Sequence, residues 1–201
     1  IKADMVDQMD YDKILSMYQD RFKDASDFTF IFVGNVDVEK MKPVIAEYLG
    51  ALPAVNRKET FKDNKIEMRQ GIYKNEFTKQ QETPKASVFA FYNGDCKYDL
   101  RNNLLLSMTS QILDLVYTEK VREDEGGTYG VYVGGTLQKY PKEKAILQII
   151  FDTAPEKKEK LMKIIFGEID NITKTGPSEA NLNKVKEYML KKHTEDLKEN
   201  S

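Results

Sequence analysis

Apolar and polar residues follow one another along the chain with the two spacings that distinguish helices from strands. Apolar residues recur every three or four positions where one side of a helix is buried. This spacing predicts helices at residues 10–24, 38–49, 99–123, 155–174 and from 178 onward. Runs rich in aromatic and β-branched residues are typical of buried strands. Such runs predict strands at residues 28–33, 65–74, 86–92, 128–138 and 144–153.

Residues that start and stop helices and strands stand at the ends of these stretches. Asp37 is suited to the N-cap of the second helix, because its carboxylate can accept hydrogen bonds from the first turn. Gly50 follows the end of that helix, and Ser178 begins the last one. Asn93-Gly94-Asp95 is expected to form a turn that closes the strand at 86–92.

The order of the predicted elements indicates an α+β fold. A helix, a strand and a helix come first, followed by two strand pairs that are separated by a long helix. Strand pairs with short connections favour an antiparallel sheet with helices packed mainly on one face. The pattern predicts a helix–strand–helix portion at 1–53, a surface connection at 54–64, and the remaining elements at 65–201.

Composition limits the partners that the chain is expected to have. Its net charge of −2, with both signs well mixed, gives no drive toward nucleic acid. No apolar run approaches the ~20 residues that a bilayer span requires. We therefore expect a soluble protein, periplasmic or cytoplasmic if it is bacterial. Because the first residue is Ile1, we also expect a piece of a longer protein.

The bend between the long helix and the next strand brings together an arginine and a tyrosine. Arg122 falls in the last helical turn, Gly126 and Gly127 permit the chain to reverse, and Tyr129 begins the strand. A guanidinium and a phenol on such a bend can bind a polarised carbonyl or a carboxylate. Alternatively, Arg122 interacts with the helix dipole and Tyr129 packs on the sheet. The segment alone leaves both interpretations open.

The rest of the chain offers little self-contained chemistry. His193 is the only histidine, and a catalytic zinc site needs three protein ligands, so we expect it to be a half-buried helix residue. No H-E-x-x-H or H-x-x-E-H pair, nucleophile elbow, Walker loop or dinucleotide fingerprint is present. Cys96 is expected to be a structural thiol. These observations predict a scaffold or binding domain that is not an enzyme by itself.

Two passages resemble the pitrilysin/insulinase family of zinc peptidases, the inverted zincins. The first is FTFIFVGNVDVEKMKPVIAEYLGALP at 28–53, which is similar to the strand, turn and helix of that family. The second is VREDEGGTYGVYVGG at 121–135, which is similar to the arginine-to-tyrosine stretch of the family's non-catalytic half. The resemblance covers nearly the whole chain and implies a processing-peptidase-like domain, a fragment of the C-terminal half.

The resemblance implies two halves that face each other across a chamber and have different roles. Zinc belongs to the other half, on H-x-x-E-H plus a distant glutamate, so no cofactor is expected in this segment. At matching positions, Arg122 and Tyr129 are the implied substrate-binding residues, and Gly126 and Gly127 form the supporting turn. The implied function is a non-catalytic C-terminal domain that closes the chamber of a zinc-dependent metalloendopeptidase and helps to bind peptide.

The resemblance also sets the expected partners and the alternatives. The expected partners are a catalytic half, in the same chain or in a partner subunit, and a peptide substrate. The segment is not expected to be active alone. One alternative is a non-enzymatic assembly or peptide-binding subunit of the same fold. Another is a free-standing domain whose exposed sheet edge accepts an extended peptide.

Overall fold

The computed structural model describes residues 2–123 and 130–199, with the backbone alone at 122 and 123. The chain forms two compact units. The smaller unit comprises residues 1–62 with 198–201, and the larger unit comprises residues 63–197.

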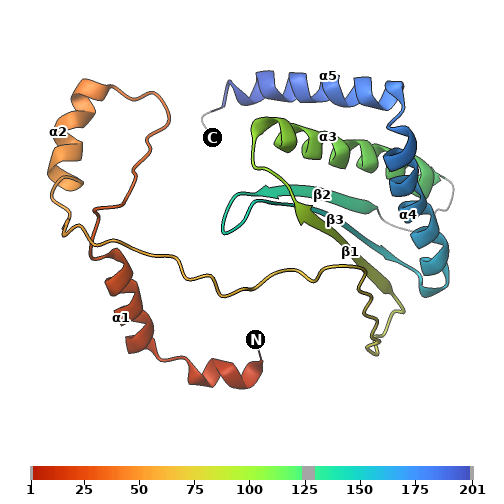
Figure 1. The fold of residues 1–201 in the computed structure, drawn as a ribbon, viewed down its shortest axis with the longest axis horizontal. Coiled ribbons are helices and arrows are strands. Elements are labelled where there is room, and N and C mark those ends of the chain that lie inside the picture. The colour runs from red at the N-terminus through yellow and green to blue at the C-terminus, as the bar shows by residue number, and fades with distance from the viewer. Residues whose placement is uncertain (1, 124–129, 200–201) are drawn as a thin grey trace. The chain divides into compact units, whose positions relative to one another are not determined.

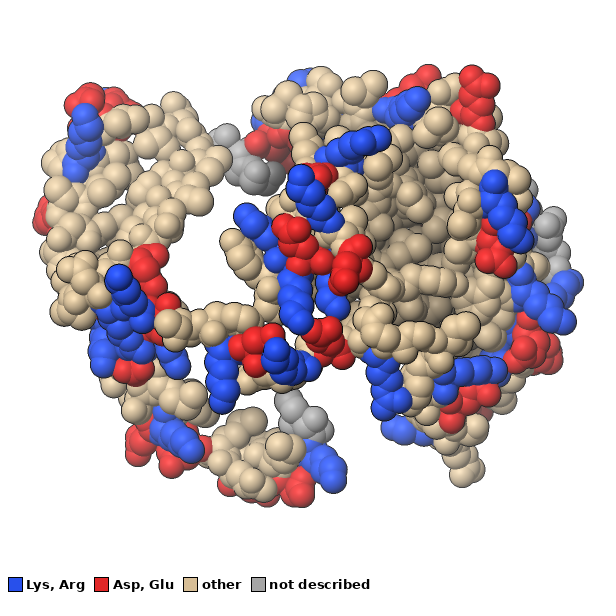
Figure 2. Space-filling view, viewed as in Figure 1, with Lys and Arg blue, Asp and Glu red and all other residues tan. Residues whose placement is uncertain are grey.

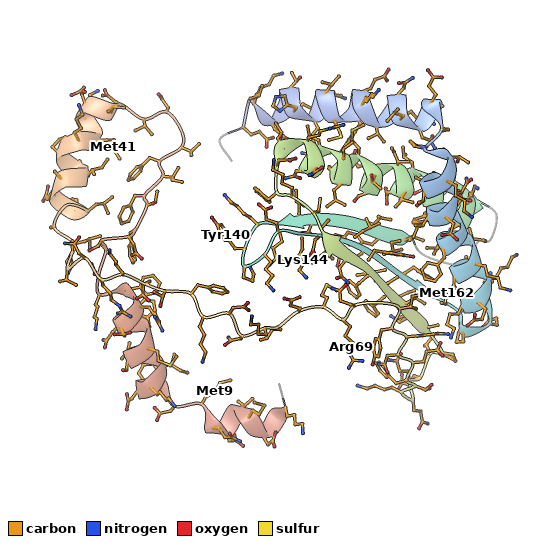
Figure 3. The ribbon with its side chains drawn as sticks, in the orientation of Figure 1. Met9, Met41, Arg69, Tyr140, Lys144 and Met162 are labelled. Atoms are coloured by element: carbon orange, nitrogen blue, oxygen red, sulfur yellow. The ribbon has the colours of Figure 1, made fainter. Side chains whose placement is uncertain are left out.

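The smaller unit contains three short helices (Figure 1), which are η1 (Ala3–Gln8), α1 (Tyr11–Phe22) and α2 (Val38–Tyr48). Met9 follows η1 (Figure 3). Asp10 caps α1 by accepting a hydrogen bond from the Lys13 amide, and Asp37 caps α2 by accepting from the amides of Glu39 and Lys40. The two predicted helices, and the predicted cap of the second, are therefore confirmed.

The predicted strand at 28–33 is wrong for this structure. These residues are extended but belong to no strand, and their side chains are exposed. Ile31 is 80% exposed and Val33 is 76% exposed. A strand exists only where a neighbouring strand pairs with its N–H and C=O groups. The described residues of the smaller unit contain no second strand that could do so.

The larger unit is built on a three-stranded antiparallel sheet (Figure 1). Its strands β1 (Ala86–Asp95), β2 (Val131–Gln138) and β3 (Lys144–Thr153) lie in the order β1-β3-β2. Tyr140 lies in the connection between β2 and β3 (Figure 3). The predicted turn at 93–95 is wrong, because these residues continue β1 and pair with residues 144–146 of β3.

The predicted strand at 65–74 is also absent from the sheet. The segment is extended, and Glu67 links it to the sheet by ion pairs, not by a backbone ladder. Glu67 pairs with Lys144 of β3, labelled in Figure 3, and with Lys142 in the connection before β3. After the segment, Glu76 pairs with Lys158, outside the sheet, at 2.7 Å. The apolar and polar alternation of this segment predicts its extended form correctly but not its hydrogen bonding.

Helices cover one side of the sheet, as the sequence predicts. They are α3 (Leu100–Tyr117), the π-helical turn η2 (Thr118–Glu123), η3 (Pro155–Lys157), α4 (Lys158–Thr175) and α5 (Glu179–Asp196). Leu113, Tyr117 and Val121 pack against Ile149 and Phe151 of β3. The predicted α+β class, with an antiparallel sheet and helices mainly on one face, is therefore confirmed.

A second apolar cluster joins α3 to α5 on the side of α3 away from the sheet. Ile112 and Val116 of α3 pack with Val185 of α5. On the sheet side, Gly135 of β2 permits close approach, since a Cβ there would lie 2.6 Å from Ser110 Oγ and 2.7 Å from Leu106 Cγ. The long helix is thus buried from two directions. No helix among the described residues is long and apolar enough to cross a membrane.

Candidate functional site

The predicted site lies on the bend between η2 and β2. Gly126, Gly127 and Tyr129 fall in residues 124–129 and the Arg122 side chain is also outside the described residues, so their roles stay predictions. What the structure does describe are the two ends of the bend. The α-helix ends at Tyr117, and a π-helical turn carries the chain to 123. Such turns often occur at functional positions.

The first end of the bend is held firmly in the core. Val121 is 2% exposed and packs in the cluster that contains Leu161 and Ile165 of α4. One residue earlier, Lys120 forms an ion pair with Glu168 of α4. These contacts fix the backbone immediately before residue 122.

The second end of the bend is held by the sheet. Val131, the first residue of β2, pairs with Phe151 near the end of β3. Gly130 has φ 153°, a conformation that favours glycine, and it therefore marks a required glycine that the sequence pattern did not single out. The bend thus connects the helices to the end of the sheet at which β3 ends.

The side of the sheet turned away from the helices carries aromatic residues, and we call it the open face. Val88 and Ala90 pack in the core, so the alternate residues Phe89 and Phe91 of β1 point to the opposite side. Phe89 is 62% exposed and Phe91 is 49% exposed.

The strand register places the aromatic residues of the open face in rows. Phe89 lies opposite Ile150, which lies opposite Tyr132, itself 56% exposed. The next row contains Gln148, whose Nε2 donates to the Tyr132 hydroxyl at 3.5 Å, and Gly134. A Cβ on Gly134 would lie 2.5 Å from that hydroxyl, so the glycine leaves room for the tyrosine ring. The sequence analysis did not identify this face. Its signal in the sequence is that aromatic residues occur at both odd and even positions of 88–92, and these positions point to opposite sides of a strand.

Charged groups occur at the two ends of the open face. At one end Asp152 accepts hydrogen bonds from Ser87 Oγ and Lys85 Nζ, which lower its pKa. At the other end Glu67 accepts from Lys142 and Lys144, which lower its pKa. Figure 2 shows, on one side of the larger unit, a hollowed area without charged side chains that has charged side chains around it.

The described residues do not fit a metal site. No group of three or more His, Cys, Asp or Glu residues among them could hold a metal ion. His193 is exposed, which corrects the expectation of a half-buried residue, because the apolar contacts of α5 end at Met189. Cys96 is a free, partly exposed thiol.

Known proteins are similar to this chain over most of its length. A sequence model described as the Peptidase M16 inactive domain matches residues 8–189. The chain is similar to a protein of Arabidopsis thaliana described as "Zinc protease PQQL-like", with 22% identity over 94% of this chain and 21% of the relative. The chain thus spans about a fifth of the length of that relative.

Two solved structures share the fold. The periplasmic protease PqqL from Escherichia coli superposes with a TM-score of 0.65 and 20% identity, over 79% of this chain and 18% of that chain. A mutant of the ferredoxin protease FusC, in complex with Arabidopsis ferredoxin, superposes with a TM-score of 0.67 and 14% identity, over 96% of this chain and 21% of that chain. The resemblance expected from residues 28–53 and 121–135 is confirmed, and the chain belongs to the family of the peptidase M16 inactive domain.

Proposed function

We propose that this chain is the non-catalytic C-terminal domain of a zinc-dependent metalloendopeptidase, in which it closes the proteolytic chamber and helps to bind peptide substrate. The descriptions of its relatives support the proposal, because the Arabidopsis protein is described as a zinc protease and both solved structures as proteases. In this family zinc belongs to the catalytic half, and the described residues of this chain do not fit a zinc site.

The open face of the sheet is the observation that carries the proposal. An aromatic and aliphatic row runs across all three strands through Phe89, Ile150 and Tyr132, and charged groups lie at the two ends of the open face. Exposed apolar area of this kind marks binding surfaces. An extended peptide can pack apolar side chains against these rings. Its backbone can remain hydrated or form hydrogen bonds with polar groups around the open face.

Arg122 and Tyr129 are proposed to act at the end of this surface. The bend that carries them joins η2, in which Val121 is buried, to Val131, the first residue of β2, and Tyr129 precedes Tyr132 by three residues in the sequence. During peptide hydrolysis the carbonyl oxygen gains negative charge, and positioned N–H and O–H donors stabilise that charge. The two side chains thus bind and orient the substrate, and neither is a base or nucleophile.

The experiment measures peptide hydrolysis by the full-length protein. Arg122→Ala and Tyr129→Phe are each expected to lower kcat/KM by more than about tenfold, the scale of one lost hydrogen bond in the transition state. Arg101→Ala and Tyr140→Phe are matched controls, because both residues are exposed and lie elsewhere on the larger unit. Unchanged kinetics in both site variants would remove their assigned roles.

The open face is tested separately by Phe89→Ala in the same protein. A surface that binds substrate and transition state equally raises KM and leaves kcat unchanged when it is trimmed. We therefore expect a severalfold higher KM for peptides with apolar side chains. An unchanged KM contradicts a role for the open face. Saturable peptide binding without any hydrolysis by the full-length protein would instead favour a peptide-binding subunit of the same fold.

A further inference from the structure

The turn η2, through which the chain leaves α3, is packed on one side and borders a cleft on the other. Val121 of η2 is 2% exposed and packs in the main core. The cleft has a volume of about 170 Å³ and lies between α3, η2, α4 and the start of α5. Its lining includes the apolar side chains of Ile112 and Ile172 and the charged side chains of Lys120 and Glu168. Core packing on one side alone does not prevent η2 from shifting into this space.

Two side chains that are three residues apart attach this part of the chain to α4, which lies beside the end of α3 (Figure 1). The hydroxyl of Tyr117, the last residue of α3, donates to the backbone oxygen of Ile165 at 3.0 Å. The Lys120 ammonium of η2 donates to the carboxylate of Glu168, which is likewise three residues farther along α4. The first contact holds the end of α3, and the second holds η2 on the side of the cleft.

The ion pair between Lys120 and Glu168 is better shielded from water than the other ion pair that holds η2. The Glu168 side chain is 15% exposed. A carboxylate with so little hydration is screened less from its partner than an exposed one, and exposed pairs contribute little. Glu119 of η2 and Lys184 of α5 are 51% and 62% exposed and lie 3.8 Å apart. Among the described residues, Glu168 is therefore the stronger ionic restraint on the position of η2.

The π-helical form of η2 connects this restraint to the residues that follow. The turn spans Thr118–Glu123 and so includes the backbone of residue 122. A π-helical turn is uncommon and persists where its surroundings hold it. Rewinding η2 into an α-helix would shift its last residues by about one position, which is a rotation of about 100° around the helix axis. The contact from Lys120 to Glu168 favours the observed placement of this backbone over the rewound one.

We propose that Glu168 is a positioning residue that holds η2, through Lys120, in the form that Arg122 needs in order to bind substrate. The inference rests on the substrate-binding role proposed above for Arg122. Glu168 acts through Lys120 and takes no part in the chemistry. When the ion pair is lost, η2 can shift toward the cleft, and Arg122 is then no longer preorganised for the charge that develops in the transition state.

A double-mutant cycle in the full-length protein tests this role by peptide hydrolysis. Glu168→Gln keeps the size of the side chain and removes its charge, and it is expected to lower kcat/KM at least about fivefold, because a misplaced donor stabilises the transition state less. In an Arg122→Ala background the same substitution is expected to change kcat/KM by less than about twofold, since the residue that it positions is gone. An equal loss in both backgrounds would show a general loss of stability and would overturn the proposal.

The partner of Glu168 gives a second cycle. Lys120→Gln is expected to lower kcat/KM as much as Glu168→Gln does, and the two substitutions together should lower it no further, because they break one ion pair. Unchanged kinetics in Lys120→Gln would contradict an action through this pair. Glu195→Gln is the matched control and should leave the kinetics unchanged, since Glu195 pairs with Lys191 at 3.9 Å on the exposed side of α5.

The single variants separate a failure of this inference from a failure of the proposed function. Unchanged kinetics in Glu168→Gln, with a loss in Arg122→Ala, would overturn the positioning role alone. Unchanged kinetics in Arg122→Ala would remove the substrate-binding role of Arg122, and the positioning role of Glu168 with it.

Discussion

A single carboxylate joins two segments of the smaller unit that are far apart in sequence. Asp24 accepts hydrogen bonds from its neighbour Ser26 and from the amides of Val55 and Arg57, at 3.0 and 2.7 Å. The Arg57 guanidinium in turn donates to Asp20 at the end of α1. The segment after α2 is therefore held against the end of α1 by charge-assisted hydrogen bonds.

These hydrogen bonds make the smaller unit sensitive to acid. The bond from Ser26, with those from the two amides, lowers the pKa of Asp24, and bonds from Lys23 and Arg57 lower that of Asp20 to about 2. A lowered pKa in the folded state contributes stability above the unfolded value of about 3.9, and that stability is lost as the pH falls toward the folded value. We expect the attachment of residues 55–57 to persist at pH 5 and to weaken progressively below about pH 4.

The measurement is an NMR titration of the Asp24 carboxyl carbon together with the Val55 and Arg57 amides. The carboxyl midpoint is expected below the ordinary aspartate value, and the amide shifts should follow the same curve. In Asp24→Asn the acid-dependent amide shifts should disappear. A carboxyl midpoint at the ordinary value would contradict the observed hydrogen bonding.

Asp24 also shows why some residues escape prediction. A carboxylate in a polar loop is usually solvated, and its partners lie 31 and 33 residues away, so no local spacing identifies it. By contrast, caps such as Asp37 act on amides two or three residues away and are readable from sequence. The bend itself singles out Arg122 and Tyr129, but their substrate-binding role rests on the family resemblance, since the segment alone also fits a structural role.

At the level of elements, α3 is buried on two sides. Met108, Ile112 and Val116 pack toward α5, while Leu113 and Tyr117 pack on the sheet. Leu104, near the start of the helix, is 45% exposed.

Two leucines of α3 provide a matched pair of substitutions. Leu113 is 2% exposed in the main core, so Leu113→Ala is expected to lower the free energy of unfolding of the larger unit by about 2–5 kcal/mol. Leu104→Ala should lower it by less than about 1 kcal/mol, because the side chain remains half solvated. Urea unfolding of both variants, followed by circular dichroism, measures the difference. Equal losses would mean that the two sides of α3 are packed alike.

The predicted helices are confirmed, while two predicted strands and one turn are wrong, for a physical reason. A helix satisfies its own backbone, so its periodicity and caps suffice to predict it. A strand depends on residues elsewhere, and residues 28–33 and 65–74 have strand-like composition without a neighbour that pairs with them. The predicted turn at 93–95 is wrong for the same reason, since β3 extends far enough to pair with all three residues.

On the scale of the molecule, buried apolar area is divided very unequally between the two units. All buried hydrophobic residues among those described lie in the larger unit, from Ile112 to Val185. A segment that buries little apolar surface cannot offset the conformational entropy of ordering it. The 201-residue chain by itself should therefore contain one cooperative unit and one that opens easily.

Limited proteolysis of the 201-residue chain tests whether the smaller unit opens more easily than the larger unit. Cleavage sites within residues 1–62 are expected to be cut at least about tenfold faster than sites within 86–123 and 130–197, because susceptibility follows local opening. Mass spectrometry of the early fragments identifies the cuts, and circular dichroism of a chain of residues 63–197 checks that the larger unit still unfolds cooperatively. Equal cleavage of both units in the short chain would mean that the smaller unit is stable despite its missing core, which would contradict the unequal burial.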